Sequence, residues 1–265
     1  RFALAGRIAH LGRMTALQIS TFRLDELLVA RGLYPSRSRA RDAILRGTVT
    51  VDGKVEAKPG RAVAGDAAIG VEDPASRYVS RAALKLVHGL EVFGIDPKGM
   101  NALDIGASTG GFTQVLLECG AAYVTAIDVG HGQLHDSLAN EPRVTAIEGL
   151  NARDLTADHL PHGAPDLIVS DVSFISLKLA LPPALDLAAP GARCILLVKP
   201  QFEVGREGIG KGGLLRDPDE GERIAADLAR WLGDRPGWRA LGTVPSPIEG
   251  GDGNREFLLG GIKDG

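Results

Sequence analysis

Four ionisable side chains are candidates for acid–base chemistry: Lys85, Asp171, Lys199 and Glu256. Lys199 ends the apolar run CILLVK, and a charge there is unusual because a protein interior does not accommodate an unpaired ion. A lysine that is neutral for part of the time can take a proton from a hydroxyl group, and a neighbouring carboxylate can orient it. Lys85 is a neighbouring cation, and Glu256 could hold Lys85 or the substrate in place.

A glycine-rich stretch, LDIGASTGGF at 103–112, is a candidate nucleotide site. It contains no lysine, so it is not a phosphate-binding P-loop. A dinucleotide fold needs G-x-G-x-x-G after its first strand, and here Ala107-Ser108 stands in place of the second glycine. Later in the chain, GREGIGKG at 205–212 resembles a P-loop, but Gly212 replaces the hydroxyl residue that would hold Mg²⁺. We expect a basic loop there, without nucleotide hydrolysis.

S-adenosylmethionine (SAM) carries no phosphate and fits the glycine-rich stretch better. Asp104 could order the turn and attract the methionine ammonium group, while Gly106 and Gly110 let the backbone pass close to the cofactor. Asp128 ends the next predicted strand and can accept both ribose hydroxyls, and Asp154 follows the third strand, where we expect the adenine amino group. The other expected cofactor-binding residues are Ser108, Gly111, Phe112 and Asn151.

These residues need a sheet that brings the ends of several strands together. Apolar runs that alternate with helical patterns predict an α/β fold with a doubly wound, seven-stranded sheet. The glycines and acids at the strand ends make it a Rossmann-like fold of the SAM-dependent methyltransferase type. The predicted strands are 101–106, 123–128, 144–149, 166–171, 193–199, 238–246 and 255–262, with helices over 80–93 and near 218–232. The last two strands have no long helix between them, so we expect them to pair antiparallel.

The amino-terminal part of the chain predicts a separate, small α+β domain at 22–72. A first helix is expected over FRLDELLVARGL, a second begins at Ser36, and Asp52-Gly53 predicts a β-hairpin after them. Residues 31–46 hold five arginines against one acid, a local formal charge of +4 in a chain of net charge −3. Such a basic face points to phosphate contacts, and the domain resembles the S-four-type RNA-binding module. The expected RNA-binding residues are Arg23, Arg31, Arg37, Arg39, Arg41 and Arg46.

The remaining segments complete the expected domain organisation. Residues 1–21 contain no acid and match no clear export signal, so we expect an extension there that is disordered or not native. Residues 73–80, DPASRYVS, combine a proline with polar residues and predict a linker. The methyltransferase domain would then occupy 81–265.

Two missing motifs narrow the choice of the atom that receives the methyl group. Enzymes that methylate exocyclic base amines commonly carry [DN]-P-P-[FY] after the fourth strand, where this chain has DVSF at 171–174. Methylation at a base carbon requires a cysteine nucleophile, and Cys119, late in a predicted helix, and Cys194, within a strand, lie in no suitable loop. Without a CxxC pair, these cysteines predict reduced, buried thiols in a cytoplasmic protein. The six histidines show no metal-ligand spacing, so we expect no metal.

The order Lys85, Asp171, Lys199, Glu256 and the motif VKPQFE resemble those of ribose 2′-O-methyltransferases of the FtsJ/RrmJ type. Together with the S-four-type module, the motifs YVSRAALKL, DIGASTGGFT and SDVSFISL resemble the TlyA (haemolysin A) family over residues 23–262. The resemblance implies SAM-dependent methylation of a cytidine ribose in ribosomal RNA, either free or within ribosomal subunits. It also implies that the four ionisable residues are catalytic.

Two other classes of function stay open. The haemolysin name implies a membrane-active protein, but the sequence has no run of about 18 apolar residues, no clear export signal and no strongly amphipathic stretch, so we expect no membrane partner. A non-catalytic RNA-binding or ribosome-assembly protein could keep the SAM motifs, although the retained set of four ionisable residues argues against it. We expect a monomer.

Overall fold

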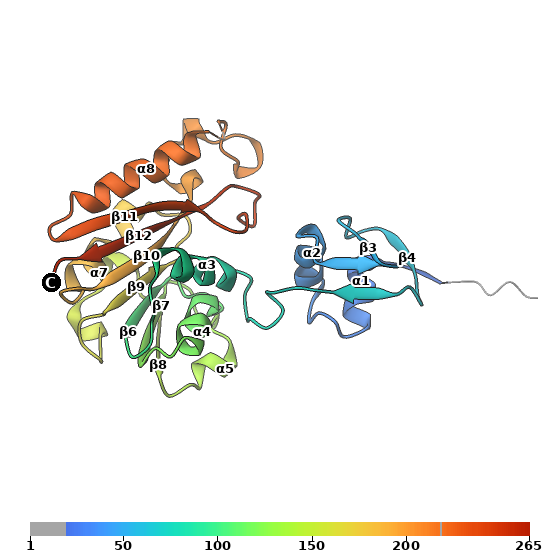
Figure 1. The fold of residues 1–265 in the computed structure, drawn as a ribbon, viewed down its shortest axis with the longest axis horizontal. Coiled ribbons are helices and arrows are strands. Elements are labelled where there is room, and N and C mark those ends of the chain that lie inside the picture. Colours follow the sequence, from blue (N-terminus) through green and yellow to red (C-terminus); the bar gives the residue numbers. More distant parts are fainter. Residues whose placement is uncertain (1–19, 218) are drawn as a thin grey trace, which may run out of the picture. The chain divides into compact units, whose positions relative to one another are not determined.

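The computed structural model describes residues 20–217 and 219–265, so nearly all of the predicted extension at 1–21 lies outside the described residues. The chain divides into two compact units between Asp73 and Pro74. Figure 1 shows both units in the colours of the sequence. Each unit has a hydrophobic core of its own. The proposed bounds 22–72, 73–80 and 81–265 stay a prediction.

The first unit combines two helices with short strands. Its elements are β1 (Thr21–Arg23), α1 (Leu24–Ala30), α2 (Arg37–Leu45), β2 (Val49–Val51), β3 (Lys54–Val55), β4 (Ala62–Ala64) and β5 (Ile69–Val71). β1 pairs with β4, and β2 pairs with both β3 and β5, all antiparallel. The two predicted helices and the predicted hairpin are confirmed, whereas β1, β4 and β5 were not predicted because three residues are too few to show a period.

Local sequence explains how this unit begins its helix and turn. The Ser36 side chain caps α2, because its Oγ accepts a hydrogen bond from the Arg39 backbone N–H at 3.3 Å. Asp52 and Gly53 have φ values of 49° and 76°, the left-handed conformation that a two-residue hairpin turn requires. Both helices pack on the strands through apolar side chains, among which Leu24, Leu28 and Ile44 are fully buried.

The second unit is a seven-stranded sheet with helices on both faces. Its strands are β6 (Asn101–Ile105), β7 (Tyr123–Asp128), β8 (Val144–Glu148), β9 (Leu167–Ser170), β10 (Arg193–Val198), β11 (Trp238–Pro245) and β12 (Phe257–Lys263). Its α-helices are α3 (Ala83–Phe93), α4 (Gly111–Glu118), α5 (Asp136–Ala139), α6 (Leu177–Ala180), α7 (Pro182–Leu187) and α8 (Glu220–Gly233). Short 3-10 helices lie in the loops: η1 (Ala152–Asp154), η2 (Ala157–His159), η3 (Pro200–Phe202), η4 (Arg206–Gly208) and η5 (Lys211–Gly213). Within the described ranges, no helix is long and apolar enough to cross a membrane.

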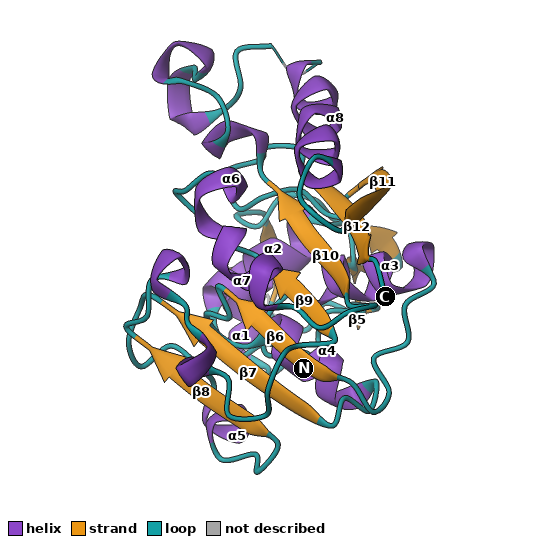
Figure 2. Ribbon diagram, turned by 90° about the vertical axis from the view of Figure 1, so that its left-hand side faces the viewer, coloured by secondary structure: helices purple, strands orange, loops and turns teal. Residues whose placement is uncertain are grey.

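The strand order is β11-β12-β10-β9-β6-β7-β8. Figure 2 shows β8, β7, β6, β9 and β10 side by side. These five strands are parallel, whereas β12 is antiparallel to both β10 and β11. The predicted seven-stranded α/β fold is therefore confirmed, and so is the antiparallel pairing of the last two strands.

The two faces of the sheet bury separate apolar clusters because strand side chains alternate. On β10, Cys194, Leu196 and Val198 belong to the cluster that contains α6, α7 and α8, whereas Ile195 and Leu197 belong to the cluster that contains α3 and α4. A strand buried on both faces has to be apolar at successive positions, as CILLV is. The apolar run therefore places Lys199 at the end of a central strand.

The two cysteines, both free thiols, differ in exposure. Cys194 is buried in the core, as predicted. Cys119 is exposed, because it ends α4 as the C-cap residue and no apolar element covers it there. The prediction of two buried thiols is wrong for Cys119.

The carboxyl ends of β6 and β9 lie where the winding of the sheet reverses. From β6 the chain continues to β7 and β8 on one side, and then returns to β9 on the other side of β6. In open α/β sheets, ligands bind in the crevice beside such a switch point. Asp171 directly follows β9 and Lys199 directly follows β10, so the fold carries two of the predicted catalytic residues to this edge.

Candidate active site

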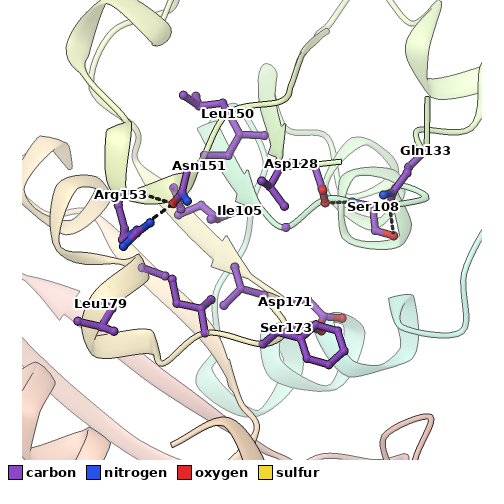
Figure 3. A pocket seen from close by; sticks show the side chains of 18 residues that line it. Ile105, Ser108, Asp128, Gln133, Leu150, Asn151, Arg153, Asp171, Ser173 and Leu179 are labelled. Atoms are coloured by element: carbon purple, nitrogen blue, oxygen red, sulfur yellow. Dashed lines mark hydrogen bonds between the residues drawn. The ribbon is translucent and has the colours of Figure 1, made fainter. Parts of the chain in front are cut away.

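Two cavities adjoin at the carboxyl ends of the parallel strands. The larger has a volume of about 640 Å³ and the smaller of about 160 Å³. The residues that line both are Gly106, Ser108, Asp171 and Ser173. Asp128 and Asn151 line the larger cavity, and Lys199 lines the smaller. Figure 3 shows Asp128 and Ser108 on one side of the larger cavity, across from Asp171 and Ser173.

The turn after β6 brings backbone close to the end of β9. Gly106 has a φ of +80°, and a Cβ at this position would lie 2.9 Å from the carbonyl oxygen of Asp171. Gly110 has a φ of +97°, and its Cβ would lie 2.3 Å from the side chain of Leu138. Both positions therefore require glycine, for conformation and for space. The next two residues, Gly111 and Phe112, begin α4 and line the smaller cavity.

Asp128 ends β7 with both carboxylate oxygens bonded to backbone. Its Oδ2 accepts the Ser108 N–H at 2.8 Å, and its Oδ1 accepts the Gly130 N–H at 2.7 Å. Each oxygen keeps a further lone pair, so the carboxylate can still accept from a ligand in the cavity. Glu148, which ends β8, accepts two backbone N–H groups of the loop after β7 at 2.6 and 3.0 Å, and these bonds hold its pKa below the usual range. The two acids together order this wall of the cavity.

The segment after β8 places Asn151 and Asp154 differently. Asn151 lines the larger cavity, and its side-chain oxygen accepts the Arg153 backbone N–H at 3.1 Å at the start of η1. Asp154 is exposed and is not among the residues that line either cavity. The structure therefore brings Asn151 to the cavity, but not Asp154, the residue expected to meet the adenine amino group.

Asp104 is fully buried under the glycine-rich turn and is not among the lining residues of either cavity. Its Oδ2 accepts a hydrogen bond from Thr113 Oγ1 on α4 at 2.7 Å, and its Oδ1 has no hydrogen-bond partner among the described residues. Burial raises its pKa to about 7, against the Thr113 hydrogen bond and with the help of the nearby Asp171 and Asp128 charges. Its position supports the predicted ordering of the turn, but not the predicted direct contact with an ammonium group.

The four ionisable residues form two ion pairs. Lys199 Nζ lies 2.6 Å from Asp171 Oδ1, and Lys85 Nζ lies 2.6 Å from Glu256 Oε2. The side chains are between 3% and 16% exposed, so both pairs are largely shielded from water. Lys85 comes from α3 and Glu256 directly precedes β12, 171 positions later in the chain. The fold thus assembles all four residues that the sequence singles out.

The two pairs interact as one electrostatic cluster. Burial raises the pKa of the Glu256 carboxyl; Lys85 and Lys199 lower it, and Asp171 raises it. Since the cluster holds two cations and two anions, it is formally neutral, and none of its charges is buried without a partner. The described ranges contain no group of three or more His, Cys, Asp or Glu side chains that could hold a metal ion.

Four of the six predicted RNA-binding arginines are tied into the first unit. Arg46 pairs with Asp42 and Asp73 at 2.9 and 2.8 Å, and only 14% of its side chain is exposed. Arg31 donates to two backbone carbonyl groups at 2.7 and 2.8 Å. The other two, Arg23 and Arg37, share the buried carboxylate of Asp25.

Arg41 and Arg46 differ most clearly in whether their guanidinium groups can contact another molecule. Arg41 is exposed on α2, and across the described ranges its guanidinium takes part in no ion pair or hydrogen bond. Arg37 is 52% exposed despite its ion pairs, and Arg39 is partly buried. If Arg46 turned outward, its ion pairs with Asp42 and Asp73 would break, and breaking a largely buried ion pair is costly. Arg46 therefore fits a structural role, and its contact with RNA stays a prediction.

Three residues near the site were not predicted. Ser173 Oγ accepts a hydrogen bond from Lys199 Nζ at 2.7 Å. Phe174 lines the larger cavity, is 90% exposed and has a φ of 63°. Glu203 accepts two hydrogen bonds from the segment after β9. The motif DVSF could have pointed to Ser173 and Phe174, because it places a hydroxyl and an aromatic side chain just after Asp171.

Comparison with known proteins adds two family matches. Residues 78–263 match the FtsJ-like methyltransferase family, and residues 22–69 match the S4 domain. A Mycobacterium tuberculosis protein named 16S/23S rRNA (cytidine-2′-O)-methyltransferase TlyA is 47% identical over 238 residues, 89% of this chain and 88% of its own. Hemolysin A of Brachyspira hyodysenteriae is 41% identical over 89% of this chain and 98% of its own.

A solved structure from Streptococcus thermophilus, which carries a hemolysin name, covers 93% of this chain and 90% of its own, with a TM-score of 0.71 and 38% identity. The relatives therefore extend over both units, and the fold agrees with the sequence match. An S4 domain precedes the methyltransferase domain, and the predicted K-D-K-E residues meet at the edge of its sheet. This chain belongs to the TlyA group of the FtsJ-like methyltransferase family.

Proposed function

We propose that this protein transfers the methyl group of SAM to the 2′-hydroxyl of a cytidine ribose in ribosomal RNA, in the cytoplasm. The observation that carries the proposal is the ion pair of Lys199 and Asp171, 2.6 Å long, at the junction of the two cavities. The substrate is supported by relatives from Mycobacterium tuberculosis and Campylobacter jejuni, whose names state cytidine 2′-O-methylation of rRNA.

The larger cavity suits SAM in size and in chemistry. Its volume of about 640 Å³ lies in the range of roughly 300–1,000 Å³ that is typical of small-molecule sites. In this proposal Asp128 accepts the ribose hydroxyls, and the Asn151 amide, which can both donate and accept, pairs with the edge of adenine. The methionine end follows the turn at Gly106 and Ser108. The methyl group then faces Asp171, towards the smaller cavity.

Lys199 acts as the proton acceptor in this proposal. A ribose hydroxyl is a weak nucleophile and the sulfonium methyl is strongly electrophilic, so the site has to align the two and remove the hydroxyl proton. The oxygen attacks the methyl carbon, the carbon–sulfur bond breaks, and the proton passes to Lys199 Nζ. Asp171 orients the amine and balances the ammonium that forms. Lys85 and Glu256 hold the ribose beside them.

The first unit supplies affinity for RNA in this proposal. Arg41 and Arg37 contact phosphates, whose attraction does not depend on base sequence. Phe174 offers an exposed aromatic face beside the site, on which an unstacked base can lie. The ring of Phe202, 4.9 Å away between centroids, supports it.

The decisive assay measures transfer of tritiated methyl from SAM to ribosomal RNA, offered both free and as isolated subunits, followed by digestion to nucleosides. We expect the wild type to form 2′-O-methylcytidine, and Lys199→Ala and Asp171→Ala to form none while SAM binding by calorimetry persists. Lys199→Arg should also fail, because a guanidinium keeps its proton. Full activity of Lys199→Arg would overturn the role of proton acceptor. If the wild type methylates neither form of RNA, a non-catalytic RNA-binding function takes the place of this proposal.

A further inference from the structure

Lys199 Nζ contacts two oxygens of the segment that follows β9, one through an ion pair and one through a hydrogen bond. Its Nζ donates to Ser173 Oγ at 2.7 Å and lies 2.6 Å from Asp171 Oδ1. Ser173 lines both cavities, whereas only 10% of the Lys199 side chain is exposed. The terminal nitrogen is therefore held between two oxygens of the segment that follows β9.

The hydrogen bond to Ser173 determines how Nζ is rotated. A neutral amine carries two N–H bonds and one lone pair, arranged tetrahedrally with Cε around the nitrogen. Asp171 Oδ1 lies 2.6 Å from Nζ but has no hydrogen-bond partner among the described residues, so this contact attracts the lysine without setting the direction of an N–H bond. The N–H bond to Ser173 does have a set direction, and it limits the lone pair to the two remaining tetrahedral positions. The Ser173 hydroxyl thus supplies the alignment that a proton acceptor needs.

A carboxylate holds the segment that carries Ser173, residues 171–177, which we call the acceptor strap. Glu203 Oε2 accepts a hydrogen bond from Ser176 Oγ at 2.6 Å, and Glu203 Oε1 accepts the Leu177 N–H at 2.8 Å. Glu203 directly follows η3, so it ties the segment after β10, which begins with Lys199, to the acceptor strap.

The backbone of the acceptor strap is also strained. Phe174, next to Ser173, has a φ of 63°, the left-handed region in which a residue with a side chain stays only when its surroundings hold it. The bonds of Glu203 to Ser176 and Leu177 supply such a hold on the carboxyl-terminal side of Phe174. The position of the Ser173 hydroxyl therefore depends on the hydrogen bonds of Glu203, a residue outside the four ionisable ones.

We propose that Ser173 is a positioning residue that directs the lone pair of Lys199 to the acceptor hydroxyl, and that Glu203 fixes the acceptor strap that carries it. The inference rests on the proposed function, because it requires Lys199 to accept the proton. Ser173 itself is exposed, so the loss of its hydroxyl removes no core packing.

Ser173→Ala tests the inference directly. We expect the single-turnover rate of methyl transfer at saturating SAM to fall roughly ten- to a hundredfold, which is within the contribution of positioned proton transfer, with SAM affinity unchanged. Ser173→Thr keeps the hydroxyl and should restore most of the rate. The matched control is Ser137→Ala, an exposed serine on α5 that lines neither cavity, and it should behave as the wild type.

The split between kcat and KM, with the rescue by Ser173→Thr, separates positioning from a general structural effect. A positioning role predicts a lower kcat in Ser173→Ala with the KM for SAM and the melting temperature unchanged. A purely structural defect would raise the KM for SAM or lower the melting temperature along with the rate.

Glu203→Gln tests whether Glu203 holds the acceptor strap in place. It keeps one acceptor oxygen, so we expect a smaller loss of rate than in Ser173→Ala. If Glu203 acts through Ser173, the double variant Ser173→Ala/Glu203→Gln should be no slower than Ser173→Ala alone; two losses that multiply would overturn the role of Glu203. An unchanged rate in Ser173→Ala, beside an active wild type, would overturn the inference alone. An inactive wild type would overturn the proposed function, and the role of Ser173 with it.

Discussion

At the scale of single residues, burial and a neighbouring cation determine how much free energy it costs to ionise each acid at the site. Asp104 is fully buried, one of its oxygens has no partner among the described residues, and its pKa is raised to about 7. Burial also raises the pKa of Glu256, but Lys85 opposes that rise at 2.6 Å. A buried carboxylate without a cation costs folding free energy, and protonation removes that cost.

Asp104→Asn should stabilise the protein at alkaline pH and much less at acidic pH. Because the folded-state pKa lies above the ordinary value of 3.8, the carboxyl contributes its full stability below about pH 4 and loses it as pH rises through about 7. Between about pH 5 and pH 8.5, the difference in unfolding free energy between variant and wild type should grow by a few kcal/mol, at about 1.4 kcal/mol per pKa unit. Urea unfolding at both pH values measures it, and a constant difference would contradict the buried ionisation.

Asp128→Ala should weaken SAM binding. The change removes a charged acceptor for two hydroxyl groups, a loss of roughly 1.5–3 kcal/mol, which is about a ten- to hundredfold rise in Kd. Isothermal titration measures the affinity, with circular dichroism as the check on folding. Asp154→Ala is the control, because Asp154 is exposed and not among the residues lining either cavity. Equal losses in the two variants would place the ribose elsewhere.

At the scale of elements, the site depends on how closely the ends of β6 and β9 approach. The turn after β6 passes close to the start of the acceptor strap. A Cβ atom at Gly106 would lie 2.9 Å from the Asp171 carbonyl oxygen, so a hydrogen atom fits there but a methyl group does not. This approach makes Gly106, Ser108, Asp171 and Ser173 common walls of both cavities. A change in the turn therefore reaches the proposed cofactor site and the proposed proton acceptor together.

Gly106→Ala should destabilise the protein and impair the site. The φ of +80° and the contact with Asp171 add conformational strain, about 1–3 kcal/mol, to a steric clash that separates β6 from β9. We expect a lower melting temperature and a SAM Kd raised at least tenfold. Gly163→Ala is the matched control, since Gly163 has a φ of +83° with nothing within 4 Å of its Cβ position. It should lower the melting temperature modestly and leave SAM affinity unchanged; an equal effect on SAM would refute the role of close approach.

At the scale of the whole molecule, the two units have separate cores and, in the proposed function, separate tasks. The first unit packs around α1 and α2, and the second packs on the two faces of its sheet. The arginine-rich segment 31–46 lies in the first unit, while the four ionisable residues and both cavities lie in the second. We therefore expect substitutions on α2 to change RNA affinity without changing SAM affinity.

Arg41→Ala and Arg46→Ala should have opposite profiles in the full-length protein. Arg41 is exposed, so its loss should weaken RNA binding and reduce the slope of log K against log salt by about 0.7, the value for one phosphate contact on a single strand. Arg46 is 14% exposed and pairs with two acids, so its loss should lower stability by roughly 3 kcal/mol or more. Fluorescence anisotropy over a salt series and thermal unfolding measure the two effects. An unchanged salt slope in Arg41→Ala would leave this arginine as an ordinary solvated residue.

The sequence by itself determined the seven strands of the large sheet and the residues at its edge. Apolar runs such as CILLVK are local patterns, and a strand buried on both faces leaves no other choice of residues, so β10 ends at Val198 and Lys199 follows it. Turn residues are equally local, which is why Asp52-Gly53 identified its hairpin. The order of Lys85, Asp171, Lys199 and Glu256 along these elements was enough to predict that they meet at one edge of the sheet.

Only the tertiary structure decided which of the predicted residues reach the cavities and which charges pair. Lys85 meets Glu256 across 171 positions, and Asp104 is buried while Asn151 lines the larger cavity. Arg46 and Arg41 have the same side chain on the same segment, yet Arg46 faces two carboxylates and Arg41 faces solvent. The reason is physical: a side chain's type and spacing are properties of the chain, but its exposure and its partners depend on the elements that pack against it, and those come from distant parts of the sequence.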